Sequence, residues 1–144
     1  MIAGRVLAFD PGSTRIGVAV SDPLRILATP LEVFPIDETD DRVRALVEEY
    51  RPTSIVVGLP VGLSGREGPA AVAAREFGRR VEALVGVEVH YVDERFTTAT
   101  AEAAMLEGGV RRRDRRRNVD KVAAAVILRQ FLDRLDRSDR DRET

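Results

Sequence analysis

Short apolar runs follow one another in an order that restricts the folds this chain can adopt. Three of them, 5–10, 16–22 and 26–34, are separated only by turns, whereas 54–59 and 87–93 each follow a segment of helical periodicity. Strands linked by a tight turn are antiparallel, and strands joined through a helix are usually parallel. The sequence therefore predicts an α/β fold with a five-stranded mixed sheet and helices on both faces.

The helices are predicted from the spacing of apolar side chains and from residues that begin or end helices. Residues 39–41 can cap the first helix, which ends before Pro52. A second helix is expected from about 70 to 84, and two more over 99–106 and 119–135. The predicted apolar stripe of the second helix consists of Val72, Phe77, Val81 and Leu84.

Length and composition limit the class of protein. A chain of 144 residues suits one domain that buries roughly two thirds of its unfolded surface; we assign 1–137 to that domain and 138–144 to a polar tail. Cysteine is absent, which excludes disulfide frameworks and thiolate metal sites. No signal-peptide pattern begins the chain, and no apolar run approaches the ~20 residues that span a bilayer. We expect a cytoplasmic protein without membrane contact.

Carboxylates lie at the ends of predicted elements that are far apart in the sequence. Asp10 closes the first apolar run, Asp93 and Glu94 close the fifth, and Asp120 opens the last helix. The carboxyl ends of parallel strands meet at one edge of such a sheet, where ligands bind. Oxygen ligands suit Mg²⁺ or Mn²⁺, and two such ions can hold the attacking and leaving oxygens of a phosphodiester. The pattern predicts metal-dependent phosphoryl chemistry with one or two ions.

Each of these residues also has a purely structural interpretation. Asp10 begins an Asp-Pro-Gly sequence, which is common in turns, and Gly12 is expected to permit positive φ there. Asp120 would stabilise the first turn of a helix by ~0.3–1 kcal/mol without any function. Asp22 and Glu67, near the expected site, are assigned to the solvated surface. The single histidine, within the fifth predicted strand, is expected to be structural.

Charge is distributed unevenly along the chain. Residues 1–108 hold 11 Arg and 17 acids, a net charge of −6, whereas residues 109–144 hold 11 Arg, Lys121 and 7 acids, a net charge of +5. The basic part begins with six arginines between 111 and 117. Guanidinium groups suit contact with phosphate, although a solvated charged loop would have the same composition.

Four segments together resemble the YqgF/RuvX family. They are Asp10–Asp22 (DPGSTRIGVAVSD), Val57–Pro60 (VGLP) with Gly65 and Gly68 after it, Asp93–Thr98 (DERFTT) and Val119–Leu128 (VDKVAAAVIL). The resemblance extends to about residue 135 and implies an RNase H-like fold, related to RuvC-type Holliday junction resolvases. It also implies a nuclease that matures the 5′ end of pre-16S rRNA.

By this resemblance the catalytic and metal-binding acids are Asp10, Glu94 and Asp120, with Asp93 as a further candidate ligand. Basic residues near them are candidates for nucleic-acid binding. These are Arg15, Arg95, Arg111, Arg112, Arg113, Arg115, Arg116, Arg117 and Lys121.

The sequence leaves the substrate open. Precursor rRNA, alone or in a ribosomal particle, fits the family resemblance, but no spacing reads the 2′-hydroxyl that distinguishes RNA from DNA. A resolvase acting on branched DNA needs two sites related by a two-fold axis, so it would be a homodimer, whereas an rRNA nuclease could be a monomer. A non-catalytic RNA-binding assembly factor is the alternative from another class.

Overall fold

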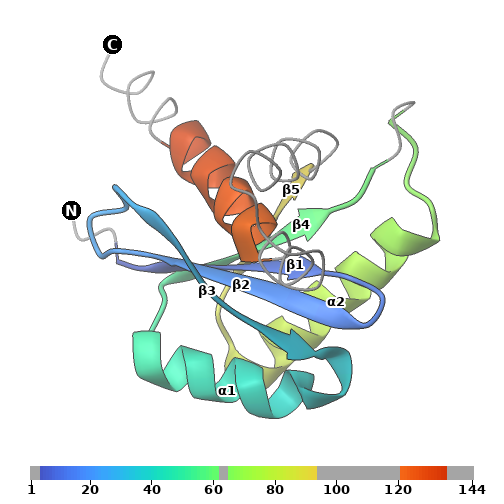
Figure 1. The fold of residues 1–144 in the computed structure, drawn as a ribbon, viewed down its shortest axis with the longest axis horizontal. Helices are drawn as coiled ribbons and strands as arrows, with labels where there is room; N and C mark the ends of the chain where they lie inside the picture. The colour runs from blue at the N-terminus through green and yellow to red at the C-terminus, as the bar shows by residue number, and fades with distance from the viewer. Residues whose placement is uncertain (1–3, 62–64, 94–120, 136–144) are drawn as a thin grey trace, which may run out of the picture.

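The computed structural model describes residues 4–61, 65–93 and 121–135. Within these residues five strands form one sheet in the order β3-β2-β1-β4-β5 (Figure 1). The strands are β1 (Val6–Pro11), β2 (Arg15–Ser21), β3 (Ala28–Pro35), β4 (Ser54–Leu59) and β5 (Val89–Asp93). β2 is antiparallel to β1 and β3, whereas β1, β4 and β5 are mutually parallel. The predicted mixed sheet is confirmed.

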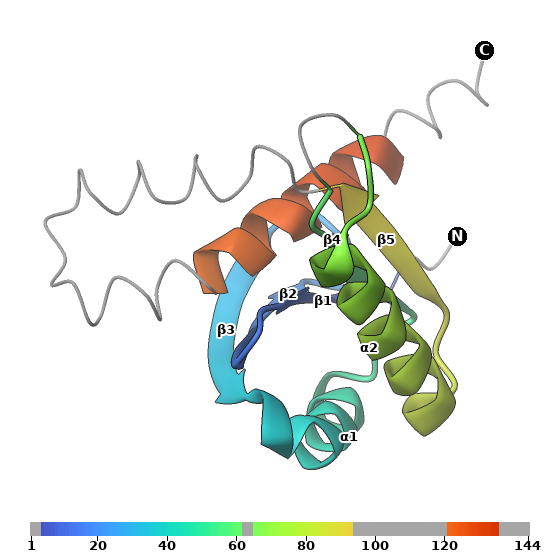
Figure 2. The ribbon, with the colours of Figure 1, turned by 90° about the vertical axis from the view of Figure 1, so that its right-hand side faces the viewer.

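Helices cover both faces of this sheet, as predicted. A 3₁₀ turn, η1 (Ile36–Glu38), leads into α1 (Thr39–Tyr50), and α2 (Pro69–Val85) connects β4 to β5. The C-terminal helix is described over 121–135. α1 and α2 lie on one side of the sheet and the C-terminal helix crosses the other (Figure 2). Within the described residues no helix is both long and apolar enough to cross a membrane.

Alternation along the strands divides the core in two. In β1, Leu7 and Phe9 pack toward α1 and α2, whereas Val6 and Ala8 pack toward the C-terminal helix. All four side chains are fully buried. Because successive side chains of a strand point to opposite faces, the face of each remaining β1 residue follows from these four. The same assignment applies to the strands paired with it.

Three details of the sequence prediction were wrong. Residues 39–41 do not cap α1, because its N-cap is Glu38, whose side chain makes no capping hydrogen bond. The Thr39 hydroxyl instead donates to the carbonyl of Ile36, 2.6 Å away. The third strand begins at Ala28 and not at residue 26. Val72 of the predicted α2 stripe is 50% exposed. The buried face of α2 consists of Ala71, Ala74, Phe77, Gly78 and Val81.

Candidate active site

Asp10 and Asp93 lie at the same edge of the sheet, as the sequence predicted. β1, β4 and β5 are parallel, and their registers place Phe9 beside Val57 and Leu59 beside Asp93. All three strands therefore end together. This carboxyl edge is where open α/β sheets bind their ligands.

The side chain of Asp10 belongs to the face that the C-terminal helix covers. It continues the alternating set of Val6 and Ala8, which pack against that helix. Its partner across β2 is Gly17, which contributes no side chain to this face. Asp10 is partly buried, so the strand fixes its backbone while solvent still reaches the residue. A carboxylate in this position can bind a ligand between the sheet and the helix.

Asp93 belongs to the opposite face. Val92 packs with the C-terminal helix, whereas Tyr91 packs on the side of α2. Asp93 continues the Tyr91 set, and its partner Leu59 also lies in the core beneath α2. The sheet therefore separates the side chains of Asp93 and Asp10, although the two residues share an edge.

A tight turn between β1 and β2 places Arg15 beside this edge. The Gly12 amide donates to the carbonyl of Arg15 at 2.8 Å, and the Ile36 amide donates to that of Thr14 at 3.0 Å. A Cβ on Gly12 would lie 2.8 Å from the Arg15 carbonyl oxygen. Gly12 does not have the positive φ that we predicted; its lack of a side chain is needed because the backbone approaches so closely.

Arg15 and Lys121, both predicted to contact nucleic acid, are brought together by the fold. They line one hollow of about 340 Å³, and the other described residues around it are Val33, Phe34 and Pro35 of β3. Arg15 begins β2, whereas Lys121 is the first described residue of the C-terminal helix. Figure 2 shows this helix starting beside β3. Two cations from distant parts of the sequence thus border one concave surface.

An ion pair that the sequence analysis missed anchors the segment after β4. Both carboxylate oxygens of Glu67 accept hydrogen bonds from Arg75 of α2, at 2.6 and 2.8 Å. These bonds hold the pKa of Glu67 below its usual value. The Arg75 guanidinium also lies 5.1 Å from the centre of the Tyr91 ring. Glu67, assigned to the solvated surface from sequence, therefore fixes this segment to α2; a spacing of eight residues across a loop gave no sequence signal.

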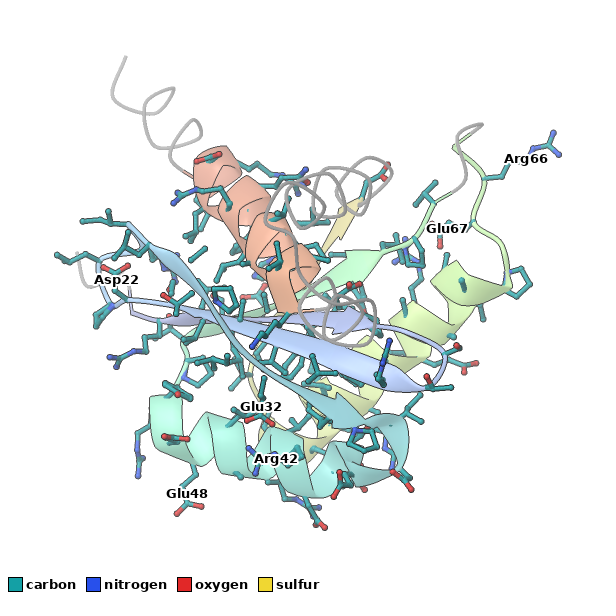
Figure 3. All side chains as sticks on the ribbon, viewed as in Figure 1. Asp22, Glu32, Arg42, Glu48, Arg66 and Glu67 are labelled. Atoms are coloured by element: carbon teal, nitrogen blue, oxygen red, sulfur yellow. The ribbon has the colours of Figure 1, made fainter. Side chains whose placement is uncertain are left out.

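Because β2 runs antiparallel to β1, Asp22 lies at the opposite end of these strands from Asp10. Figure 3 shows Asp22 at the loop between β2 and β3. The expectation that Asp22 lies near the site was wrong. Its carboxylate accepts hydrogen bonds from the amides of Leu24, Ile26 and Leu27 at 3.2, 2.8 and 2.7 Å. These backbone donors, Leu27 foremost, lower the pKa of Asp22. Asp22 organises the loop between β2 and β3.

Most of the predicted basic cluster and two of the predicted acids lie outside the described residues. Among the residues that the structure does describe, no group of three or more His, Asp or Glu side chains could hold a metal ion. The predicted helix over 99–106 and the tail 138–144 also lie outside. The predicted site residues in these gaps are Glu94, Arg95, Arg111, Arg112, Arg113, Arg115, Arg116, Arg117 and Asp120.

Comparison with known sequences decides the family. The sequence profile of the RuvX family, described as "Holliday junction resolvase", matches residues 4–134. The chain belongs to the RuvX family. It is 44% identical over 134 residues to a Lactococcus lactis subsp. cremoris protein named "Putative pre-16S rRNA nuclease", covering 90% of this chain and 94% of that one. A Streptomyces coelicolor protein of the same name is 45% identical over 137 residues, with 92% and 82% covered. The resemblance to this family is confirmed.

Solved structures confirm the RNase H-like fold of the RuvC type. Thermus thermophilus RuvC in complex with a Holliday junction substrate matches with a TM-score of 0.55 and 20% identity, over 92% of this chain and 96% of that one. The Fowlpox virus resolvase bound to Holliday junction DNA matches with a TM-score of 0.53 and 11% identity, over 91% and 98%. At such identities the likeness concerns the fold alone.

Proposed function

We propose that this RuvX-family chain is a nuclease that hydrolyses phosphodiester bonds at the 5′ end of precursor 16S rRNA. The observation that carries the proposal is the position of Asp10, a partly buried carboxylate at the carboxyl edge of the parallel strands and on the face of the C-terminal helix. The name shared by the similar Lactococcus and Streptomyces proteins supports the choice of substrate.

Asp10, Glu94 and Asp120 would hold one or two Mg²⁺ or Mn²⁺ ions. The donor chemistry fits, because the chain has no cysteine and its one histidine, His90, packs its ring 5.2 Å from that of Phe131 on the C-terminal helix. Carboxylate oxygens are therefore the metal ligands that the chain offers. Such ions, when bound, supply an activated water and stabilise the leaving oxygen.

The chain's own residues would position the substrate around this site. Asp10 is fixed in register between two strands and would hold its carboxylate in one place on the helix face. We assign Glu94 and not Asp93 to the ligand set, since Asp93 follows the α2 side of the sheet. Asp93, the last residue of β5, would have a structural role there. The arginines of 111–117 and Arg95 would contact substrate phosphates, giving affinity that falls with salt.

A nuclease acting on precursor rRNA would work in the cytoplasm, with structured RNA or a ribosomal particle as its partner. The alternative substrate is branched DNA, which the description of the family profile favours. That activity would need a homodimer with two related sites, whereas rRNA cleavage is compatible with a monomer. A chain that binds RNA without cutting it would be an assembly factor.

The test compares wild-type and Asp10→Asn proteins on end-labelled precursor-rRNA fragments and four-way DNA junctions, with Mg²⁺, Mn²⁺ or EDTA. Asp133→Asn is the matched control, because Asp133 is an exposed acid on the C-terminal helix. We expect metal-dependent cutting of the rRNA fragment by wild type and Asp133→Asn, and none by Asp10→Asn. Normal cutting by pure Asp10→Asn protein would contradict the proposed site, and preferred cutting of junctions would reassign the substrate.

A further inference from the structure

We propose that the hollow between β2, β3 and the C-terminal helix binds one unpaired nucleotide of the substrate strand, with its phosphate between Arg15 and Lys121. We call this surface the Arg15–Lys121 hollow; Val33, Phe34 and Pro35 complete its described lining. The inference deepens the proposed function and rests on it, since it takes a nucleic acid as the substrate.

The two cations suit a single phosphate. Arginine presents a planar fork of donors that matches phosphate oxygens, whereas lysine adds a compact point charge. Arg15 begins β2, whereas Lys121 begins the described part of the C-terminal helix, so the two cations reach the hollow from the sheet and from the helix. No acidic residue is among the described residues that line it. The two cations among the described lining residues suit an anionic ligand.

The backbone under Arg15 is held from both sides. Its carbonyl accepts a hydrogen bond from the Gly12 amide at 2.8 Å, and Arg15 is the pairing partner of Pro35 of β3. The Ile36 amide closes the same corner by donating to the carbonyl of Thr14 at 3.0 Å. A cation on such a fixed backbone loses less conformational entropy on binding than one on a long loop.

The size of the hollow is sufficient for one nucleotide. Its volume of about 340 Å³ is near the lower end of the roughly 300–1,000 Å³ that small-ligand sites occupy. Val33 and Pro35 offer an apolar surface to a sugar or the edge of a base. The Phe34 ring does not provide a stacking surface, because its residue is only 2% exposed and belongs to the core beneath α1. We therefore expect little base selectivity.

Sheet register connects the hollow to Asp10. Asp10 pairs with Gly17, and Gly17 pairs with Val33, so the three residues form a row across β1, β2 and β3. Two strand spacings separate Asp10 from Val33, about 10 Å between backbones. Gly17 has no side chain, so β2 places none between Asp10 and Val33 in this row. A strand cut at Asp10 can pass over Gly17 and place a neighbouring nucleotide in the hollow at the sheet edge.

Binding of a labelled RNA hexamer, single-stranded or annealed to its complement, tests the proposal. The measurements use full-length Asp10→Asn protein in EDTA, so that neither cleavage nor metal contributes. Arg15→Gln and Lys121→Gln remove one cation each. Arg44→Gln, exposed on α1, and Arg134→Gln, exposed near the end of the C-terminal helix, are matched controls that remove the same charge elsewhere.

We expect Arg15→Gln and Lys121→Gln each to weaken single-strand binding about three- to tenfold. This loss lies between the value of an exposed ion pair and that of a hydrogen bond to a charged group. Each should also lower the salt slope of log affinity by about 0.7, as expected for one lost phosphate contact. The controls should do neither. Thermal melting of all variants, with Arg15→Lys as a charge-conserving replacement, separates lost binding from lost folding.

The outcomes distinguish the hollow from the nuclease activity. If the hollow variants and the control variants bind the single strand with equal affinity, the proposed nucleotide site is wrong, even if wild type cuts rRNA. Equal binding of single strand and duplex would overturn its assignment to an unpaired nucleotide. Weakened binding specific to Arg15→Gln and Lys121→Gln would support the hollow even if wild type fails to cut, in which case only the proposed catalysis falls.

Discussion

Two Asp-Pro pairs, each at the end of an apolar strand, have different places in this molecule. Asp10 precedes Pro11 at the carboxyl edge of three parallel strands, on the face of the C-terminal helix. Asp22 precedes Pro23 and accepts hydrogen bonds from three amides of the loop that follows. β2 runs antiparallel to β1, so the same dipeptide falls at opposite ends of the sheet.

The comparison shows that local sequence does not decide what a carboxylate does. Both residues follow short apolar runs, and both could form turns. Asp22 begins a loop whose amides turn back toward it, so its charge is used within the loop. Asp10 begins a hairpin whose turn is closed by backbone bonds of Gly12. Strand direction then places Asp10, and not Asp22, where parallel strands end.

The two aspartates should differ most in their effect on cleavage activity. Asp10→Asn should lower the cleavage rate by more than the roughly 10- to 100-fold typical of residues that only orient metal ligands, without changing the melting temperature. Asp22→Ala should retain the wild-type rate at temperatures well below its melting point, because it lies at the far end of the sheet. Cleavage assays paired with thermal melts check this. Loss of activity in folded Asp22→Ala would contradict the separate roles assigned to the two aspartates.

Gly12→Ala should be the most damaging change to the turn at the Asp10 end. Its Cβ would lie 2.8 Å from the Arg15 carbonyl oxygen, and overpacking of this kind costs about 1–3 kcal/mol. Urea denaturation measures the loss, and cleavage should fall as well because the turn holds both Asp10 and Arg15. Gly68→Ala is the control, since its Cβ would meet nothing within 4 Å. Equal stabilities of the two variants would contradict this account of the turn.

At the Asp22 end, Ser21→Ala should affect stability alone. The Ser21 hydroxyl accepts a hydrogen bond from the buried Val6 amide at 2.8 Å, and leaving such a donor unpaired costs about 1–3 kcal/mol. Chemical denaturation should show this loss, while the cleavage rate stays at the wild-type value. Thr29→Ala, which removes an exposed hydroxyl from β3, should cost little. A comparable loss in both variants would mean that the Ser21 bond is not the cause.

The smallest expected effect is the pH dependence of the Asp22 loop. Backbone amides lower the pKa of Asp22 in the folded protein below the ordinary value of 3.8. Its contribution to stability is therefore present above about pH 3.8 and is lost as pH falls through the lower, folded-state pKa. The difference in melting temperature between wild type and Asp22→Ala should shrink on acidification below pH 3.8. A difference that grows there would refute the assigned hydrogen bonds.

Strands were predicted well from sequence, and helix faces less well. β4 has the predicted bounds, because a β-branched run buried on both faces leaves little choice. The predicted stripe of α2 was right at Phe77 and Val81, which are buried, and wrong at Val72, which is exposed. Two small residues that were not predicted, Ala71 and Ala74, are buried instead. Alanine occurs both in protein cores and on surfaces, so hydrophobicity alone did not identify all of the residues on the buried face of α2. The third strand starts later than predicted because the Asp22 carboxylate binds the amides of Ile26 and Leu27.

The candidate site was only partly predictable for a related reason. The sequence placed Asp10 and Asp93 at one edge, and the registers agree. Strand alternation already favoured Glu94 over Asp93 as the ligand, but the face to which the Asp93 side chain belongs depends on how the strands pack in the assembled sheet. It also named Arg15 and Lys121 separately, without predicting that β3 would complete a hollow between them.

The order of strands and helices, the carboxylates available as metal ligands and membership of the RuvX family all follow from the amino-acid sequence. Apolar periodicity and side-chain chemistry are local properties, so they can be read along the chain. The folded chain was needed to show which Asp-Pro pair lies at the carboxyl edge, to which face Asp93 belongs, and which cations share a surface. These outcomes depend on strand direction and register, which are set by packing between residues far apart in the sequence.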